Sequence, residues 1–456
     1  MKKSILLLMG VATATLAFAS KDVKPVAFNA DANVCCIGDS ITHNGKYMKN
    51  IVLFYVTRYP TDKINFYNVG ISGDTAGYAN KRLEEDVLSL KPDFATLMIG
   101  MNDTKFMREF PNEWFRNKLA ENRKMYVKNV DEIIQKCKKA NCRLILFAPS
   151  PYDKYAQIKE KPVVFAKHRE LEYFSDQCRR FAYKYNLPLV DMWNYMKDVN
   201  AVIQKEFPEI TTAGKDRVHP TDMGGYVMMS NFVRTFGEHR EISTVEIDAG
   251  KSKLDVAYNC DITNFKADKT SVSFDSFEYS LPFPLNDETK FAEKYIRFAK
   301  DYNRQIIKVV GLEKGEYNLL IDGKIVGEYS ADDLSKGVNI GNNPKTPQYE
   351  QAVETEKASF IFRDFCNELR EINATEMWQR LYELDSFEAR VKRLETMLKE
   401  NKIHHPYIRK CATLYKTTKP KQAEMFAKSR ELFEQLYKVA TPKKHTFELK
   451  KINKAN

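Results

Sequence analysis

Four short polar segments of the chain contain the residue types that acyl transfer requires. The first, Gly38-Asp39-Ser40, follows the apolar run Val34 to Ile37 and leads into a helical pattern. A serine on such a tight turn can act as a nucleophile, and free N–H groups at the helix start can stabilise negative charge on a bound oxygen. Alone, the triplet also fits an ordinary helix cap, because Asp and Ser both favour that position.

The second and third segments offer hydrogen-bond donors. Ser72-Gly73-Asp74 and Gly100-Met101-Asn102-Asp103 follow the next two apolar runs of the chain. The N–H of Gly73 could face the serine, and the amide of Asn102 is a neutral donor suited to an oxyanion. Each segment alone fits plain turn chemistry equally well, because Gly, Asn and Asp favour turns.

The fourth segment pairs an imidazole with a carboxylate. Asp216 and His219 lie three residues apart, far from Ser40 in sequence, and Pro220 shapes the loop that follows. An imidazole can take a serine proton, while the carboxylate fixes its tautomer and stabilises the imidazolium. A lone histidine is usually structural, so the pair gains its weight from the other three segments.

Together, and in this order, the four segments resemble the sequence blocks of the SGNH hydrolases, also called the GDSL esterase and lipase family. The resemblance covers residues 32 to 238, and Ile41 stands where the family name implies leucine. It implies a serine ester hydrolase in which Ser40 attacks an acyl carbonyl, His219 is general base and then general acid, and Asp216 orients His219.

The resemblance also implies how charge on the substrate oxygen would be held. The oxyanion hole would consist of three donors: the N–H of Ser40, the N–H of Gly73 and the side-chain amide of Asn102. Such chemistry needs water to hydrolyse the acyl-enzyme, and it needs neither a metal nor an organic cofactor.

The elements around these segments alternate between strand and helix. Apolar strands are predicted at 34–37, 64–69, 94–99, 143–147 and 187–190, and helices at 45–58, 78–90, 117–139, 165–185 and 222–236. This alternation predicts an α/β fold with a parallel sheet covered on both faces, which the resemblance makes a doubly wound, flavodoxin-like sheet. Reactive groups of such folds lie at the carboxyl ends of the strands, where the four segments fall.

The N-terminus has the pattern of a bacterial secretory signal peptide. Lys2 and Lys3 precede an apolar run from Ile5 to Leu16, and small residues lead to a cleavage point near Ala19. The run is shorter than the roughly 20 residues that span a bilayer. We therefore expect export to the periplasm or the outside of the cell, without an integral membrane segment in the mature chain. A retained N-terminal anchor is the alternative.

Beyond residue 241 the pattern changes twice. Short strands are predicted at 244–247, 271–274, 306–311, 317–321 and 324–329, and Asp322-Gly323 predicts a hairpin. Residues 345 to 445 return to a helical pattern, with Trp378 on an apolar stripe that is typical of a core. We expect a signal peptide at 1–19, the hydrolase domain at 20–241, a β-rich accessory module at 242–343 and a helical, basic C-terminal region at 344–456.

The charge distribution and the cysteine spacing limit which partners and metal sites we expect. The net charge is +11, and residues 401 to 456 alone hold 14 Lys or Arg against 4 Asp or Glu. This tail could contact an anionic polysaccharide or a membrane surface, or be a solvated helical face, and export excludes nucleic acid as a partner. The eight cysteines contain no C-x-x-C pair and predict no metal site. Cys366 and Cys411 could bridge two helices.

The substrate is the least specified part of the prediction. No long apolar lid or acyl tunnel is evident, which together with export and the β-rich module favours a short acyl group, acetyl, on a carbohydrate. A lipid acylhydrolase or lysophospholipase, a sugar acyltransferase and a catalytically inactive carbohydrate-binding protein are the alternatives. Four aromatic side chains could stack on sugar rings or be ordinary core residues: Trp114, Tyr152, Tyr155 and Trp193.

Overall fold

A five-stranded parallel sheet forms the first part of the protein. The computed structural model describes residues 28–105, 112–238 and 241–452, so the predicted signal peptide lies outside the described residues. The sheet has the strand order β2-β1-β3-β4-β5, which confirms the predicted α/β class. Its strands are β1 (Asn33–Gly38), β2 (Asn65–Asn68), β3 (Phe94–Met98), β4 (Arg143–Ala148) and β5 (Leu189–Asp191).

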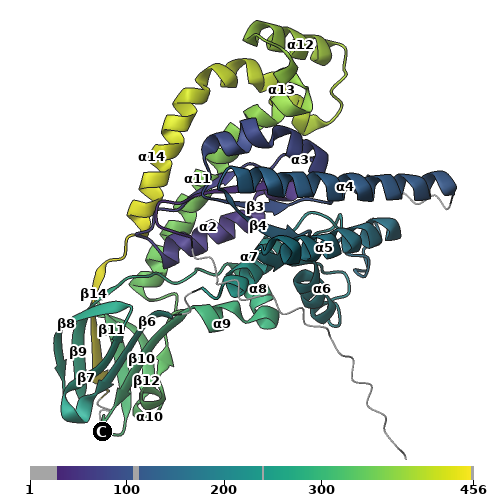
Figure 1. Cartoon of the computed structure of the whole chain (residues 1–456). Coiled ribbons are helices and arrows are strands. Elements are labelled where there is room, and N and C mark those ends of the chain that lie inside the picture. The colour runs from purple at the N-terminus through teal and green to yellow at the C-terminus, as the bar shows by residue number, and fades with distance from the viewer. Residues whose placement is uncertain (1–27, 106–111, 239–240, 453–456) are drawn as a thin grey trace, which may run out of the picture.

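Helices cover both faces of this sheet (Figure 1). On one face α2 (Lys46–Arg58) packs against α7 (Asp222–Phe236), and on the other α3 (Ala76–Arg82), α4 (Glu113–Lys139) and α5 (Phe165–Tyr185) pack in a row. Burial on both faces explains why the strands read as continuous apolar runs, since all of β3 is buried. The sequence prediction lacks α6 (Met192–Ile203), which begins directly after the three-residue strand β5. Within 242–343, where it expects only strands, it also lacks α8 (Asp287–Ile296), α9 (Phe298–Tyr302) and α10 (Ala331–Lys336).

The β-rich part is a sandwich of two sheets at one end of the molecule (Figure 1). One sheet has the order β13-β10-β6-β7, built from β6 (Glu241–Asp248), β7 (Lys253–Tyr258), β10 (Arg304–Val310) and β13 (Val338–Asn339). The other has the order β12-β11-β14-β9-β8, built from β8 (Cys260–Ala267), β9 (Ser271–Glu278), β11 (Glu316–Ile321), β12 (Lys324–Ser330) and β14 (Lys444–Lys451). Apolar side chains from both sheets form one buried cluster between them.

Strand β14 differs from the sequence prediction. Residues 344–456 are expected to be helical, yet β14 pairs with β11 on one side and β9 on the other, in the middle of the second sheet. Its side chains alternate between the core and the surface, with Phe447 and Leu449 buried. The segment is short and basic, so this period-two alternation is weak beside the helical pattern before it.

Four helices connect β13 to β14 and return to the parallel sheet. They are α11 (Pro347–Trp378), α12 (Phe387–Lys399), α13 (Pro406–Thr418) and α14 (Gln422–Ala440). α11 packs against both α2 and α14, and Leu436 and Tyr437 of α14 belong to the same core cluster as the parallel sheet. Cys366 and Cys411, like the other six cysteines, are free, so the suggested bridge between them is absent.

Two smaller helices bind the sandwich to the sheet part. α8 (Asp287–Ile296) packs against α7, and α9 (Phe298–Tyr302) places Phe298 in the same core cluster. None of the helices within the described residues combines the length and apolar character that crossing a membrane requires.

Candidate active site

Ser40 lies at the carboxyl end of β1, where the turn into α1 (Ser40–Asn44) is tightly constrained. The carboxylate of Asp39 caps the helix by accepting a hydrogen bond of 3.0 Å from the N–H of Ile41. A Cβ on Gly38 would lie 2.1 Å from Thr42 Oγ1 and 2.7 Å from the carbonyl oxygen of Met98, so only glycine fits. The glycine thus permits the close packing of β1, β3 and α1 that fixes the position of the serine.

A continuous hydrogen-bonded chain joins Ser40 to the distant Asp216–His219 loop. Ser40 Oγ lies 2.8 Å from His219 Nε2, and His219 Nδ1 lies 2.5 Å from Asp216 Oδ2. The other carboxylate oxygen of Asp216 accepts the backbone N–H groups of Val218 and His219 at 3.0 and 2.9 Å. Hydroxyl, imidazole and carboxylate therefore have the order and spacing that proton transfer from a serine requires.

The carboxylates near His219 make its imidazole a stronger base. The hydrogen bond that His219 donates to Asp216 raises the pKa of His219, against the effect of burial. Burial raises the pKa of Asp216, but its hydrogen bonds with the side chain and backbone of His219 outweigh this and lower the pKa to about 2. Burial raises the pKa of Asp39 to about 6. A further cation that the sequence does not reveal, Lys167 of α5, is 7% exposed and lowers the pKa of both Asp39 and His219.

The glycine and asparagine segments lie at the same edge of the sheet as Ser40. The backbone of Gly73 has φ +87°, and a Cβ there would meet no atom within 4 Å, so this turn faces open space. Asn102 follows β3 and donates one amide hydrogen to the carbonyl oxygen of Asp74 at 2.9 Å. Its second amide hydrogen has no partner among the described residues, so it can serve another acceptor.

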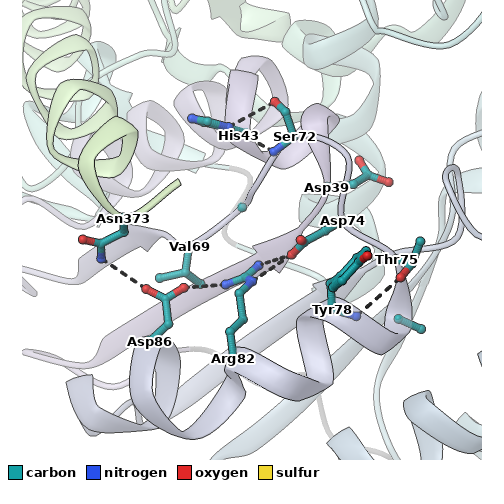
Figure 2. Close-up of polar contacts among 12 residues, drawn as sticks. Asp39, His43, Val69, Ser72, Asp74, Thr75, Tyr78, Arg82, Asp86 and Asn373 are labelled. Atoms are coloured by element: carbon teal, nitrogen blue, oxygen red, sulfur yellow. Dashed lines mark hydrogen bonds and ion pairs between the residues drawn. The ribbon is translucent and has the colours of Figure 1, made fainter. Parts of the chain in front are cut away.

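A buried ion-pair network supports the glycine segment from below (Figure 2). Arg82, 3% exposed, donates to Asp74 at 2.8 Å and to Asp86 at 2.6 Å. Asp74 is also the residue whose carbonyl oxygen accepts from Asn102. Arg82 therefore holds the segment to which the asparagine side chain is bonded.

Helix α11 completes this network from far along the chain. Arg370 donates to the carbonyl oxygens of Gly70 and Val69, both at 3.0 Å, and to the carboxylate of Asp86 at 2.7 and 2.6 Å. Burial would raise the pKa of Asp86, but the guanidinium groups of Arg370 and Arg82 together hold it well below its usual range. The sequence gives no sign of this contact, because nothing in the local pattern of α11 distinguishes Arg370.

Trp378, at the end of α11, contacts the same segment. Its Nε1 donates to the carbonyl oxygen of Ser72 at 2.8 Å, and its ring lies 6.0 Å from the ring of His43. His43 Nδ1 in turn accepts the backbone N–H of Ser72 at 3.1 Å, as Figure 2 shows. Trp378, which the sequence places on an apolar stripe typical of a core, therefore also fixes Ser72, the residue that precedes Gly73.

The four aromatic side chains considered for stacking fall into two pairs. Tyr152 and Trp193 are buried, at 4% and 1% exposed, whereas Trp114 and Tyr155 are 56% and 61% exposed.

No group of three or more His, Cys, Asp or Glu side chains in the described part of the chain is arranged to hold a metal ion.

This chain is similar to a protein-family model, to the sequence of a known enzyme and to a solved structure. Residues 36–225 match the model of the GDSL-like Lipase/Acylhydrolase family. The acetylxylan esterase of Geobacillus stearothermophilus is 27% identical over 219 residues, which is 44% of this chain and 92% of that protein. A solved structure described as "BT4096 a gut microbial diltiazem-metabolizing enzyme" is 27% identical with a TM-score of 0.86, and the match covers 94% of this chain and 100% of that one. The last similarity thus extends through the sandwich and the C-terminal helices.

Proposed function

We propose that this carboxylic ester hydrolase, whose residues 36–225 match the model of the GDSL-like Lipase/Acylhydrolase family, removes short acyl groups, acetyl above all, from carbohydrate. The nucleophile is Ser40. The observation that carries the assignment is the unbroken chain from Ser40 Oγ through His219 to Asp216, with distances of 2.8 and 2.5 Å.

The proposed reaction has two halves. Ser40 Oγ attacks the acyl carbonyl while His219 Nε2 takes its proton, and Asp216 stabilises the imidazolium that forms. The oxyanion binds the N–H groups of Ser40 and Gly73 and the free amide hydrogen of Asn102. His219 then protonates the leaving alcohol, which departs and leaves an acyl group on Ser40. Water, deprotonated by His219, hydrolyses this ester and restores the serine.

Two similarities bear on the substrate. One relative is an acetylxylan esterase, which supports a short acyl group, and the protein that matches nearly the whole chain is described as a gut microbial diltiazem-metabolizing enzyme. The first similarity and the proposed export of the protein support a carbohydrate as the alcohol part of the ester substrate. Export itself rests on Lys2, Lys3 and the apolar run after them, and the mass of the mature N-terminus would test cleavage near Ala19.

The first experiment compares wild-type protein with Ser40→Ala on p-nitrophenyl acetate, butyrate and octanoate and on acetylated xylo-oligosaccharides. Ser89→Ala is the matched control, because Ser89 is an exposed serine that bonds only to the carbonyl oxygen of Glu85 in the described structure. We expect acetate turnover that is abolished by Ser40→Ala and retained by Ser89→Ala. A preference for octanoate would favour a lipid acylhydrolase, and equal rates in wild type and Ser40→Ala would refute the serine mechanism.

A further inference from the structure

A cavity of about 470 Å³ lies against the segment after β4 that is hydrogen-bonded to Arg217, and it is not lined by Ser40, Asp216 or His219. Its walls are residues 151–155 after β4, His168 of α5, and residues 197–205 at the end of α6. This volume lies within the range of about 300 to 1,000 Å³ that is usual for small-molecule sites. Nothing in the reaction proposed above uses the cavity, so its occupant has to be argued from its walls.

The wall after β4 and the loop that carries His219 form one hydrogen-bonded unit. The N–H of Asp153 donates to the carbonyl oxygen of Arg217 at 3.2 Å. The guanidinium of Arg217, 2% exposed, donates back to the carbonyl oxygens of Asp153 and Ala156 at 2.9 and 2.7 Å. A ligand in the cavity would therefore lie against a rigid segment fixed to the residue between Asp216 and His219.

His168 gives the cavity a hydrogen-bond acceptor. The side chain is 5% exposed, and its Nδ1 lies 2.9 Å from the carbonyl oxygen of Tyr152. A carbonyl oxygen only accepts, so Nδ1 carries the proton, and burial lowers the pKa of His168, which keeps the ring neutral. Nε2 is then an acceptor without a partner among the described residues, and it is not sealed from solvent. Such an atom suits a ligand hydroxyl.

Tyr155 gives the cavity an apolar platform at its mouth. The side chain is 61% exposed, and its ring lies edge-on to that of His168 with 5.9 Å between the centroids. The nearby carboxylate of Asp153 is already bonded to the N–H groups of Tyr155 and Ala156 and to Gln204. Lys154 Nζ lies over the Tyr155 ring, 4.9 Å from its centroid, so a ligand packs on the part of this exposed ring that Lys154 leaves open. The wall is thus preformed, and it presents this aromatic surface beside a hydroxyl acceptor, without a free carboxylate from Asp153.

We propose that this cavity binds one unacylated ring of a carbohydrate and so holds the substrate while a neighbouring acylated ring reaches Ser40. The C–H face of a sugar packs on Tyr155, and a hydroxyl donates to His168 Nε2. The saccharide class rests on the proposed function. The binding site itself rests on the geometry of the cavity.

Tyr155→Ala is the variant that tests the proposal, since the exposed ring can be removed without opening the core. Tyr155→Phe keeps the aromatic face, and Tyr183→Ala on α5 is the matched control because that side chain is 74% exposed. Loss of one aromatic contact, about 0.5 to 1.5 kcal/mol, corresponds to roughly two- to tenfold weaker binding. We expect KM for acetylated xylo-oligosaccharides to rise by this factor in Tyr155→Ala only. The kcat/KM for p-nitrophenyl acetate should not change.

Binding of unacetylated xylotriose to Ser40→Ala protein, measured by calorimetry or saturation-transfer NMR, separates this proposal from the esterase assignment. Binding that is lost on adding Tyr155→Ala and kept on adding Tyr183→Ala supports the site. Equal binding with and without Tyr155 overturns it. If the wild type hydrolyses acetate esters but no oligosaccharide binds, the sugar site is wrong while the serine mechanism stands. If Ser40→Ala keeps its esterase activity, the mechanism is wrong and the binding result alone decides the site.

Discussion

Replacing Arg370 with methionine should slow the reaction although the residue is in the C-terminal helical region. Arg370 is 5% exposed and bonds to the carbonyl oxygens of Val69 and Gly70 and to the carboxylate of Asp86. Those carbonyls lie only a few residues before Gly73, whose N–H is proposed to bind the oxyanion. We therefore regard Arg370 as a positioning residue that acts through this segment.

The structure sets the size of the expected effects. Removing one partner of a buried ion pair costs about 3 to 5 kcal/mol, and the lower end applies because Asp86 keeps its bond to Arg82. Complete loss of one oxyanion donor costs about 2.7 to 4 kcal/mol in the transition state. Arg370 shifts a donor without deleting it, so we expect about half of that lower value, which is roughly a tenfold fall in kcat.

The assay measures kcat and KM for p-nitrophenyl acetate under conditions where unfolding curves show each variant to be folded. Arg370→Met should lower kcat with little change in KM, and Arg370→Lys should restore part of the rate because it returns the charge. Arg363→Met is the matched control, since Arg363 contacts Asp364 and Phe360 on the same helix. Combined with Asn102→Ala, the loss should be less than additive, because both changes weaken the same oxyanion hole.

Two results would refute this reasoning. The first is an unchanged kcat for the folded fraction of Arg370→Met, which would reduce Arg370 to a structural brace. The second is full additivity with Asn102→Ala, which would mean that the two side chains act on independent features.

Three further predictions test the site and the sandwich. His219 must be neutral to act as a base, so activity falls as the pH drops through its raised pKa. The charge of Asp39 contributes to this raised pKa. Asp39→Asn should therefore move the acid limb of the kcat/KM profile to lower pH. An unmoved limb would contradict the influence of Asp39. Asn102→Ala should lower kcat by about a hundredfold or more in ester turnover assays, and a merely tenfold loss would argue against its role as a donor. Phe447→Ala should lower the free energy of unfolding by about 3 to 5 kcal/mol in denaturant titrations. The reason is that Phe447 is 2% exposed and its ring stacks on that of Phe274, with 5.1 Å between the centroids. A loss under about 1 kcal/mol would count against β14 as a core strand.

The sequence predicts what local pattern and parallel topology decide. Apolar runs give the five strands, and a parallel sheet places all their carboxyl ends at one edge. Segments that end different strands, such as those of Ser40 and Asn102, must therefore lie near one another whatever their separation along the chain. The loop of Asp216 and His219 precedes α7, and the structure brings its imidazole to 2.8 Å from Ser40 Oγ.

Contacts between distant segments leave no such local mark. Arg370 bonds to carbonyl oxygens 300 residues away, and a carbonyl acceptor carries no side-chain signature. Helix α6 is not predicted because it begins directly after β5, with no turn residues between the two to mark its start. Tyr155 and His168 cannot be joined from sequence either, because the loop between them has no regular pattern from which to infer their distance.

The sandwich explains how a helical region far from Ser40 can be held precisely enough to support it. Helix α11 starts soon after β13, α14 ends shortly before β14, and both strands belong to the sandwich, which therefore fixes both ends of the helical region. Near its start, Gln348 donates to the buried carboxylate of Glu278 on β9 at 2.7 Å, and Gln351 donates to two carbonyl oxygens at the end of α14, also at 2.7 Å. Because its N-terminal turns are anchored in this way and it packs on α2, α11 holds Arg370 in contact with the glycine segment. The sandwich and the helices thus form one continuous support for the glycine segment, and the similar structure that covers 94% of this chain extends over all three parts.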